Sequence, residues 1–220
     1  MCWNENVSLN TFVFSTLTLL FIWYNNSYTQ YKITDFKNGY FYLVMFGFSS
    51  MQLIEYFLWK SIHTKNVVMN KTFSLIGLLL VRIVQPLSLL LVIPKMYNTL
   101  KYLLFVLYFS VLIIVYTYKY FYNPVDFKSV IDKNESLDWK WGYLYNYERI
   151  VFVIHMVIFF TLFLSYPLYT FFISLFLLYS VIIYKYSFGS MWCFLTNSIF
   201  IWFLIKILIV LPYLEKNKIC

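Results

Sequence analysis

The sequence predicts an all-α protein that crosses a membrane many times, folded as a compact bundle of about seven transmembrane helices. Hydrophobic residues make up 62% of the 220 residues and charged residues 12%, whereas soluble domains average about 45–50% and about 25%. The apolar residues also gather in runs separated by short polar segments. A lipid bilayer is therefore the expected surrounding of this chain, and lipid its expected partner.

Seven membrane spans are expected. A helix needs about 17–25 predominantly apolar residues to cross the roughly 30 Å hydrocarbon core of a bilayer. Runs of this kind, the first of them short, lie at 9–24, 39–60, 72–94, 98–121, 148–166, 167–184 and 190–213. Glu5 precedes the first run and no small-residue cleavage pattern follows it, so we interpret it as a retained helix and not as a signal peptide.

The segments between the spans are short and contain turn-forming pairs such as Asn123-Pro124 and Tyr166-Pro167. The sizeable polar stretch is 123–148, which we expect to cap one end of the bundle. Glycine and proline are scarce, at five each, which argues against a flexible linker or a Gly-rich phosphate loop. Residues 1–220 are therefore expected to form a single transmembrane domain.

Seven crossings place the two ends of the chain on opposite faces of the membrane. Face A is the one with the N-terminus and the segment 123–148, and face B is the one with the C-terminus. The net charge of +8 is scattered over helix ends, which favours anchoring to phosphate headgroups and argues against nucleic-acid binding. Fewer lysines fall on face A outside that segment than on face B, and the positive-inside rule then predicts a cytoplasmic C-terminus. The lysines are Lys60, Lys65, Lys71 and Lys185 on face A, and Lys32, Lys37, Lys95, Lys101, Lys216 and Lys218 on face B.

Three charged side chains, Glu55, Arg82 and Lys206, lie within the expected spans. Each such charge costs at least about 2.5–3.5 kcal/mol in a bilayer, so it usually faces the bundle interior and has a partner. At 1.5 Å per residue, Glu55 lies about 7 Å from Lys60 at the end of its span, His155 lies about 10 Å from face A, and Arg82 lies near the midplane. We therefore expect Glu55 and Arg82 to pair in the half of the bundle nearer face A.

Other polar residues of the spans would surround the Glu55–Arg82 pair, because spacings of three or four positions place residues on the same face of a helix. Two interpretations of the group stay open: a structural clamp between helices, or a site for an ion or small solute. A single histidine in an apolar helix is more often a hydrogen-bonded interior residue than a ligand. The candidate site residues are Gln52, Glu55, Arg82, Gln85, His155, Trp192, Cys193 and Asn197.

The three cysteines, Cys2, Cys193 and Cys220, are too few for a disulfide framework and show no CxxC spacing, so neither a metal site nor a cofactor is predicted. Cys2 and Cys193 both fall on face A and could form a thiol pair. One of them could instead serve an intramembrane enzyme as nucleophile or metal ligand, with Glu55 or His155 as base. No HExxH or Ser/His/Asp pattern supports an enzyme.

Lys206 occupies the last span, where the Schiff-base lysine of a retinal-binding seven-helix protein would be expected. The span at 72–94 offers Arg82 instead of a carboxylate counter-ion, so the likeness to rhodopsins is one of helix number only. Lys206 could also extend toward face B, which lies about 10 Å away along the helix.

Three short patterns occur along the chain: Met1-Cys2 followed by Ser8, Gln52-x-x-Glu55-x-x-x-Trp59, and Gly189-Ser190-x-Trp192-Cys193-Phe194. Together they resemble a family of small, uncharacterised multi-pass membrane proteins of bacteria and large DNA viruses. Tyr56 departs from the family pattern, which has glycine there. The family has no established activity, so the resemblance implies a relative and not a mechanism.

These observations favour two classes of function. The first is a transporter or channel-like bundle with a polar site at Glu55, Arg82 and His155, although the sequence shows no inverted repeat and no paired broken helices. The second is a structural component of a membrane, for example that of a virion. The enzyme and the retinal-binding protein remain as further alternatives, and the oligomeric state stays open.

Overall fold

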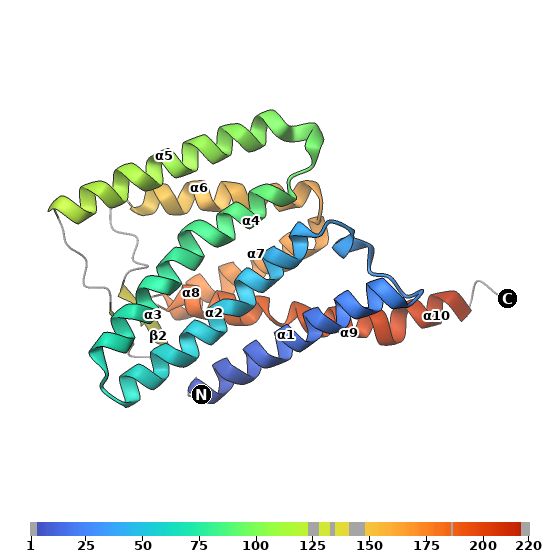
Figure 1. Ribbon diagram of the computed structural model, residues 1–220, viewed down its shortest axis with the longest axis horizontal. Helices are drawn as coiled ribbons and strands as arrows, with labels where there is room; N and C mark the ends of the chain where they lie inside the picture. The colour runs from blue at the N-terminus through green and yellow to red at the C-terminus, as the bar shows by residue number, and fades with distance from the viewer. Residues whose placement is uncertain (1–3, 123–127, 133–134, 141–147, 186, 217–220) are drawn as a thin grey trace.

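The computed structural model describes residues 4–122, 128–132, 135–140, 148–185 and 187–216, and almost all of them are helical (Figure 1). The first four helical segments are α1 (Glu5–Tyr28), α2 (Tyr40–His63), α3–η2–α4 and α5 (Asn98–Tyr122). The third is composed of α3 (Val67–Leu79), η2 (Leu80–Val84) and α4 (Gln85–Val92). The short helices η1 (Thr34–Lys37) and η3 (Lys95–Tyr97) lie in the connections.

Three more helical segments complete the described part of the chain. They are α6 (Glu148–Phe160) continued by η5 (Thr161–Leu164), then α7 (Pro167–Tyr184), then a long interrupted segment. This last segment is composed of α8 (Phe188–Thr196), α9 (Ile199–Ile205), η6 (Lys206–Val210) and α10 (Leu211–Lys216).

The fold class predicted from the sequence, an all-α membrane bundle, is confirmed. Six helices of the described chain are long and apolar enough to cross a bilayer. They are Glu5–Tyr28, Tyr40–His63, Val67–Val92, Lys95–Tyr118, Pro167–Tyr184 and Phe188–Lys216. The α6–η5 segment is the seventh helical segment and is not among these six. It has 13 residues in α6 and 4 in η5, which gives it a length of about 27 Å.

Several helices begin or end a turn away from the expected bounds, because side chains cap them there. The first extends over 5–28, and its start is capped by Asn4, whose Oδ1 accepts from Val7 N at 3.1 Å. In the third, Asn66 Oδ1 accepts from Met69 N at 2.9 Å, so α3 begins five residues before the expected start at residue 72. Capping by asparagine stabilises a helix start even where the first turn is polar.

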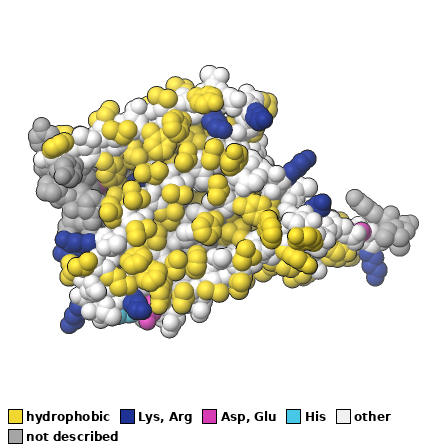
Figure 2. Space-filling view, viewed as in Figure 1, with side chains coloured by type: hydrophobic (Ala, Val, Ile, Leu, Met, Phe, Trp, Pro, Cys, Tyr) yellow, Lys and Arg dark blue, Asp and Glu magenta, His cyan; other side chains and the backbone are white. Residues whose placement is uncertain are grey.

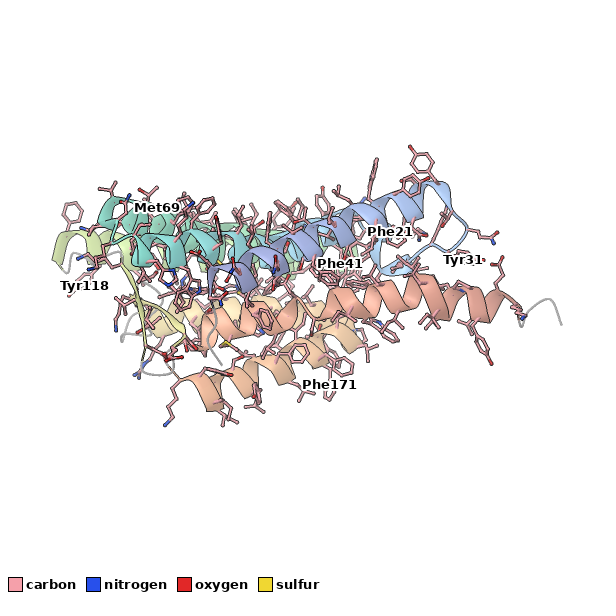
Figure 3. All side chains as sticks on the ribbon, turned by 90° about the horizontal axis from the view of Figure 1, so that it is seen from below. Phe21, Tyr31, Phe41, Met69, Tyr118 and Phe171 are labelled. Carbon is pink, nitrogen blue, oxygen red and sulfur yellow. The ribbon has the colours of Figure 1, made fainter. Side chains whose placement is uncertain are left out.

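The helices form two layers, seen edge-on in Figure 3. The first four segments make one layer, and α6, α7 and α8–α10 make the other. Helix α2 packs against α1, α3, α4 and α8, and it is the most buried of the spans. Helix α1 begins at one end of the bundle and α10 ends at the other (Figure 1).

The surface suits a bilayer. In Figure 2 apolar side chains cover the middle of the visible face, and the lysine and arginine side chains lie toward its two ends. Large apolar residues are exposed on every span; Leu17 is 60% exposed, Ile113 65% and Ile182 60%. An apolar surface of this extent is stable against lipid and would aggregate in water.

The expected capping segment 123–148 contains a small antiparallel hairpin in its described part. Strands β1 (Ser129–Ile131) and β2 (Leu137–Trp139) pair with Ser129 opposite Trp139 and Ile131 opposite Leu137. The hairpin lies at face A, where β1 contacts α3 and β2 contacts α8.

Two helical segments contain irregular turns, which the apolar periodicity of the sequence did not predict. In η2 the chain makes a π turn, in which Gln85 N–H bonds to Leu80 O. Pro86 follows directly; it has no N–H, and its ring would clash with the carbonyl four residues earlier, that of Arg82. The wider turn makes room for the ring, and the Tyr108 hydroxyl donates to the freed Arg82 carbonyl at 2.9 Å.

The last span is interrupted twice. At Asn197 and Ser198 the chain makes tight turns between α8 and α9. Further on, η6 is a second π turn, in which Leu211 N–H bonds to Lys206 O and Pro212 follows. Arg82 and Lys206, the charged residues predicted within these spans, therefore both lie in π turns, which occur often at functional sites.

Candidate functional site

Five polar residues from three helices meet in the half of the bundle nearer face A, and we call them the Glu55 cluster. Gln52 and Glu55 come from α2, Gln85 from α4, and Ser190 and Cys193 from α8. Glu55 is 0% exposed, and Gln52 Nε2 donates to Glu55 Oε2 at 3.1 Å. The Ser190 hydroxyl and the Cys193 thiol lie close enough to interact with the Glu55 carboxyl group.

The Glu55 cluster is incompletely hydrogen-bonded within the described chain. Glu55 Oε1 and Ser190 Oγ are both buried, and neither has a hydrogen-bonding partner of good geometry there. An unpaired buried polar atom costs about 1–3 kcal/mol, and more when it is charged. The cluster therefore contains two buried polar atoms that have no hydrogen-bonding partner among the described residues.

Gln85 connects the cluster to the interior of α2. Its Nε2 donates to the Gly47 carbonyl oxygen at 3.2 Å, and its amide group also interacts with the Cys193 thiol. A Cβ at position 47 would lie 3.5 Å from Gln85 Cγ, an ordinary contact distance. Gln85 thereby ties α4 to both α2 and α8.

Asn197 lies at the turn between α8 and α9, and it joins two helices. Its backbone N–H bonds to Phe194 O, so the Cys193 carbonyl loses its usual helical donor. The Asn197 side-chain amide takes that place, donating to Cys193 O at 2.7 Å, while Ser15 of α1 donates to Asn197 Oδ1 at 2.8 Å. Asn197 thus stabilises the helix interruption and fixes α1 against it.

The two tryptophans of the resemblance have different surroundings. Trp192 is directed away from Glu55: its Nε1 donates to Ile173 O of α7 at 3.1 Å, and its ring packs edge-on against Phe48 and Phe159. Trp59 lies one turn beyond Glu55 on the same side of α2, is 3% exposed, and its Nε1 has no partner among the described residues.

The expected ion pair between Glu55 and Arg82 does not form: no salt bridge of the described residues includes either side chain. The guanidinium group of Arg82 instead interacts with Tyr108 and Tyr116 of α5 and lies near His155 of α6. The spacing rule that placed Arg82 and Gln85 on one face holds for a regular helix, and the π turn changes it.

Arg82 is therefore part of a second group, between η2, α5 and α6, together with Tyr108, Tyr116, Glu148 and His155. Glu148 is the first residue of α6, is 2% exposed, and interacts with Tyr116. Glu148 is the last residue of the expected polar segment 123–148. Its burial was not predicted, because the start of a helix next to a polar stretch gives no signal of depth. His155 is buried in this group and not beside Glu55.

Lys206 belongs neither to the Glu55 cluster nor to the group around Arg82. Its Nζ bonds to Asp35 Oδ2 of η1 at 2.6 Å, and the Tyr169 hydroxyl donates to the same oxygen at 3.0 Å. The Tyr166 hydroxyl donates to the Asp35 carbonyl oxygen at 3.0 Å. The sequence did not predict Asp35 as the partner of Lys206.

The thiol pair expected from the sequence cannot be placed. Cys2 lies outside the described residues, and Cys193 is a buried free thiol. Within the described ranges no three His, Cys, Asp or Glu side chains are grouped so that they could hold a metal ion.

Comparison with known proteins gave no match to a family model, a curated protein or a solved structure. The fold and the composition therefore define the class on their own: this is a multi-pass integral membrane protein with a buried polar cluster between α2, α4 and α8.

Proposed function

We propose that the protein binds a small monovalent cation, with the proton as the smallest, at Glu55, and that it couples this binding to movement of an ion or small solute across the membrane. The observation that carries the proposal is a carboxyl group that is fully buried in a membrane span, has no cationic partner in the described chain, and keeps one oxygen unpaired. An isolated carboxylate charge is too costly in such surroundings unless a cation neutralises it.

Labelling with dicyclohexylcarbodiimide, which enters the bilayer and reacts with protonated carboxyl groups, tests the site. In reconstituted vesicles we expect Glu55 to be modified, with the extent falling as the pH rises, as read from peptide mass spectrometry. Protection by Na⁺ or K⁺ at constant pH would identify a metal cation as the ligand, and labelling that depends on pH alone would identify the proton. A Glu55 that stays unmodified under all these conditions contradicts the proposal.

Transport is tested in the same vesicles with a pH-sensitive or cation-sensitive dye inside. Glu55→Gln should abolish the flux, because an amide keeps the size of the side chain and cannot carry the charge. Glu148→Gln is the matched control, since Glu148 is also buried but lies in the Arg82 group, and it should leave carbodiimide labelling of Glu55 unchanged. Equal flux with wild type and Glu55→Gln would overturn the coupling.

A structural role is the second candidate, because polar side chains of this region also join helices. Ser15 bonds to Asn197 across α1 and the last span, and Gln85 bonds to Gly47 across α4 and α2. If the cluster only holds the bundle together, Glu55→Gln will alter the unfolding midpoint in detergent and no flux will be found for either protein.

The resemblance to the small multi-pass family also remains a proposal. It is supported by the way two of its sequence patterns meet: Gln52 and Glu55 of the first lie beside Ser190 and Cys193 of the second. Residues so far apart in the sequence that share one buried cluster are expected to act as one unit. Cys2 and Ser8 carry the third pattern, and no contact between it and the cluster is proposed.

A further inference from the structure

We infer that the hairpin of β1 and β2 is a lid over the Glu55 cluster, which controls the access of water and cations from face A. This inference rests on the proposed function, because it concerns the regulation of the same site. It is carried by three sets of contacts that fasten the described part of the hairpin across the ends of α2, α3 and α8.

The first set joins β1 to α3 and α2 through Asn70. Its Nδ2 donates to Ser129 O at 3.1 Å and to Ser61 Oγ at 3.0 Å, and its Oδ1 accepts from Ser129 N at 2.9 Å. One turn further along α3, the hydroxyl groups of Ser74 and Ser129 lie 2.9 Å apart. The side chain of Asn70 therefore bonds to both backbone groups of Ser129, as the backbone of a neighbouring strand would. Because the bonding groups of α3 are side chains, they can exchange these hydrogen bonds for bonds to water.

The second set places β2 against the start of α8. The Trp139 ring lies so close to Gly189 that a Cβ there would approach its Cζ3 to 3.0 Å. The next residue is Ser190, whose hydroxyl lies beside Glu55. The third set is a bond from Ser187 Oγ to Asp132 Oδ2 at 3.1 Å, which ties the hairpin to the turn before α8.

The position of these contacts puts the hairpin between Glu55 and the water at face A. Ser61, which accepts the bond from Asn70, is six residues beyond Glu55 on α2, or about 9 Å along the helix axis. Leu137, Asp138 and Trp139 are all buried, so β2 is packed into the end of the bundle and does not project into solvent. Movement of β1 and β2 away from Asn70 and Gly189 would uncover the route to Ser190 and Glu55.

A reversible cross-link tests the lid. Ser74→Cys with Ser129→Cys, in a background of Cys2→Ser and Cys220→Ser, should form a disulfide, because the two hydroxyl oxygens are already in contact. Two carbodiimides are then compared on vesicles: a water-soluble one applied from face A, and dicyclohexylcarbodiimide, which arrives through lipid. Oxidation should slow the modification of Glu55 by the soluble reagent about tenfold or more, which corresponds to an increase of about 1.4 kcal/mol in the free energy of opening the lid. Reduction should restore the original rate.

The lipid-borne reagent separates this inference from the proposed function. If it modifies Glu55 equally in the oxidised and reduced protein while the soluble reagent slows, the lid is supported. Equal rates with the soluble reagent in both states overturn the lid and leave the cation site intact. No modification by either reagent overturns the proposed function as well.

A second variant covers the case in which the disulfide fails to form. Asn70→Ala removes the three hydrogen bonds that the Asn70 side chain makes in the first set. It should increase the rate of modification by the soluble reagent and leave the rate with the lipid-borne one unchanged. Asn98→Ala, at an exposed asparagine of face B, is the matched control and should change neither rate. Identical rates for Asn70→Ala and the control contradict the lid.

Discussion

At the scale of single residues, the buried polar side chains divide into those with complete hydrogen bonding and those without. Asn197 uses both ends of its amide, whereas Glu55 and Ser190 each keep a buried atom without a partner in the described part of the chain. The sequence predicted that Glu55, Gln52 and Asn197 would be buried, because polar residues within long apolar runs must face the interior. Their partners were not predictable: Ser15 and Asn197 are 182 positions apart, and a single sequence contains no trace of that pairing.

Replacing Asn197 tests a buried polar side chain whose hydrogen bonding is complete. Asn197→Ala should lower the free energy of unfolding by about 1–2 kcal/mol, because it leaves the Ser15 hydroxyl and the Cys193 carbonyl without their partners. The measurement is unfolding in a denaturing detergent, followed by circular dichroism.

Ser198→Ala is the neighbouring control. The Ser198 side chain is exposed and bonds only to Leu195 O within its own turn, so its loss should cost under about 0.5 kcal/mol. A cost for Asn197→Ala as small as that of the control would show that the two bonds do not hold α1 to the last span.

At the scale of elements, the π turn η2 explains why the expected Glu55–Arg82 pair does not exist. Apolar periodicity predicted a helix across 72–94, and a helix is present, but periodicity does not reveal a change from α to π geometry within it. Pro86 was the available signal, because a proline inside a span disturbs the turn before it. Pro86 indicates where the irregular turn lies, but it does not indicate which neighbouring helix the Arg82 side chain contacts.

The Tyr108 hydroxyl and Pro86 should show strong coupling in a double-mutant cycle. Tyr108→Phe alone should destabilise the protein by about 1 kcal/mol, since the Arg82 carbonyl loses its donor. In the Pro86→Ala background the same change should cost much less, because the backbone N–H gained at position 86 can bond to that carbonyl.

Detergent unfolding of wild type, both single variants and the double variant gives the coupling energy. Tyr102→Phe on the same helix is the control, because Tyr102 is 65% exposed. Strict additivity of Tyr108→Phe and Pro86→Ala would mean that the hydroxyl does not replace the missing helical bond.

At the scale of the whole molecule, the sequence predicted the fold class and the seven helical segments. Length and apolar composition carry that information, because the bilayer sets both. The hairpin was missed, since three-residue strands within a polar stretch have no distinctive pattern. The contact of Asp35 with Lys206 was missed for the same reason as the Ser15 pairing: 171 positions separate them.

The seventh crossing is tested by the location of the two termini. If α6 with η5 spans the bilayer, reporter tags at the N-terminus and the C-terminus should respond on opposite sides, with the C-terminal tag in the cytoplasm by the positive-inside rule. Protease protection of the tags in sealed vesicles measures this. Tags on one side would show that the α6–η5 segment does not cross, and an N-terminal tag in the cytoplasm would reverse the predicted orientation.

The π turn at η2 can also be viewed as one surplus residue in a membrane helix. Removing a residue from 80–84 would restore regular winding, yet it would rotate everything beyond it by about 100° relative to everything before it. Asn70 and Ser74 would keep their contacts with the hairpin, while Gln85 would leave Gly47 and Cys193. The two ends of this helix contact different neighbours, and a single additional residue in the π turn sets the rotation of one end relative to the other.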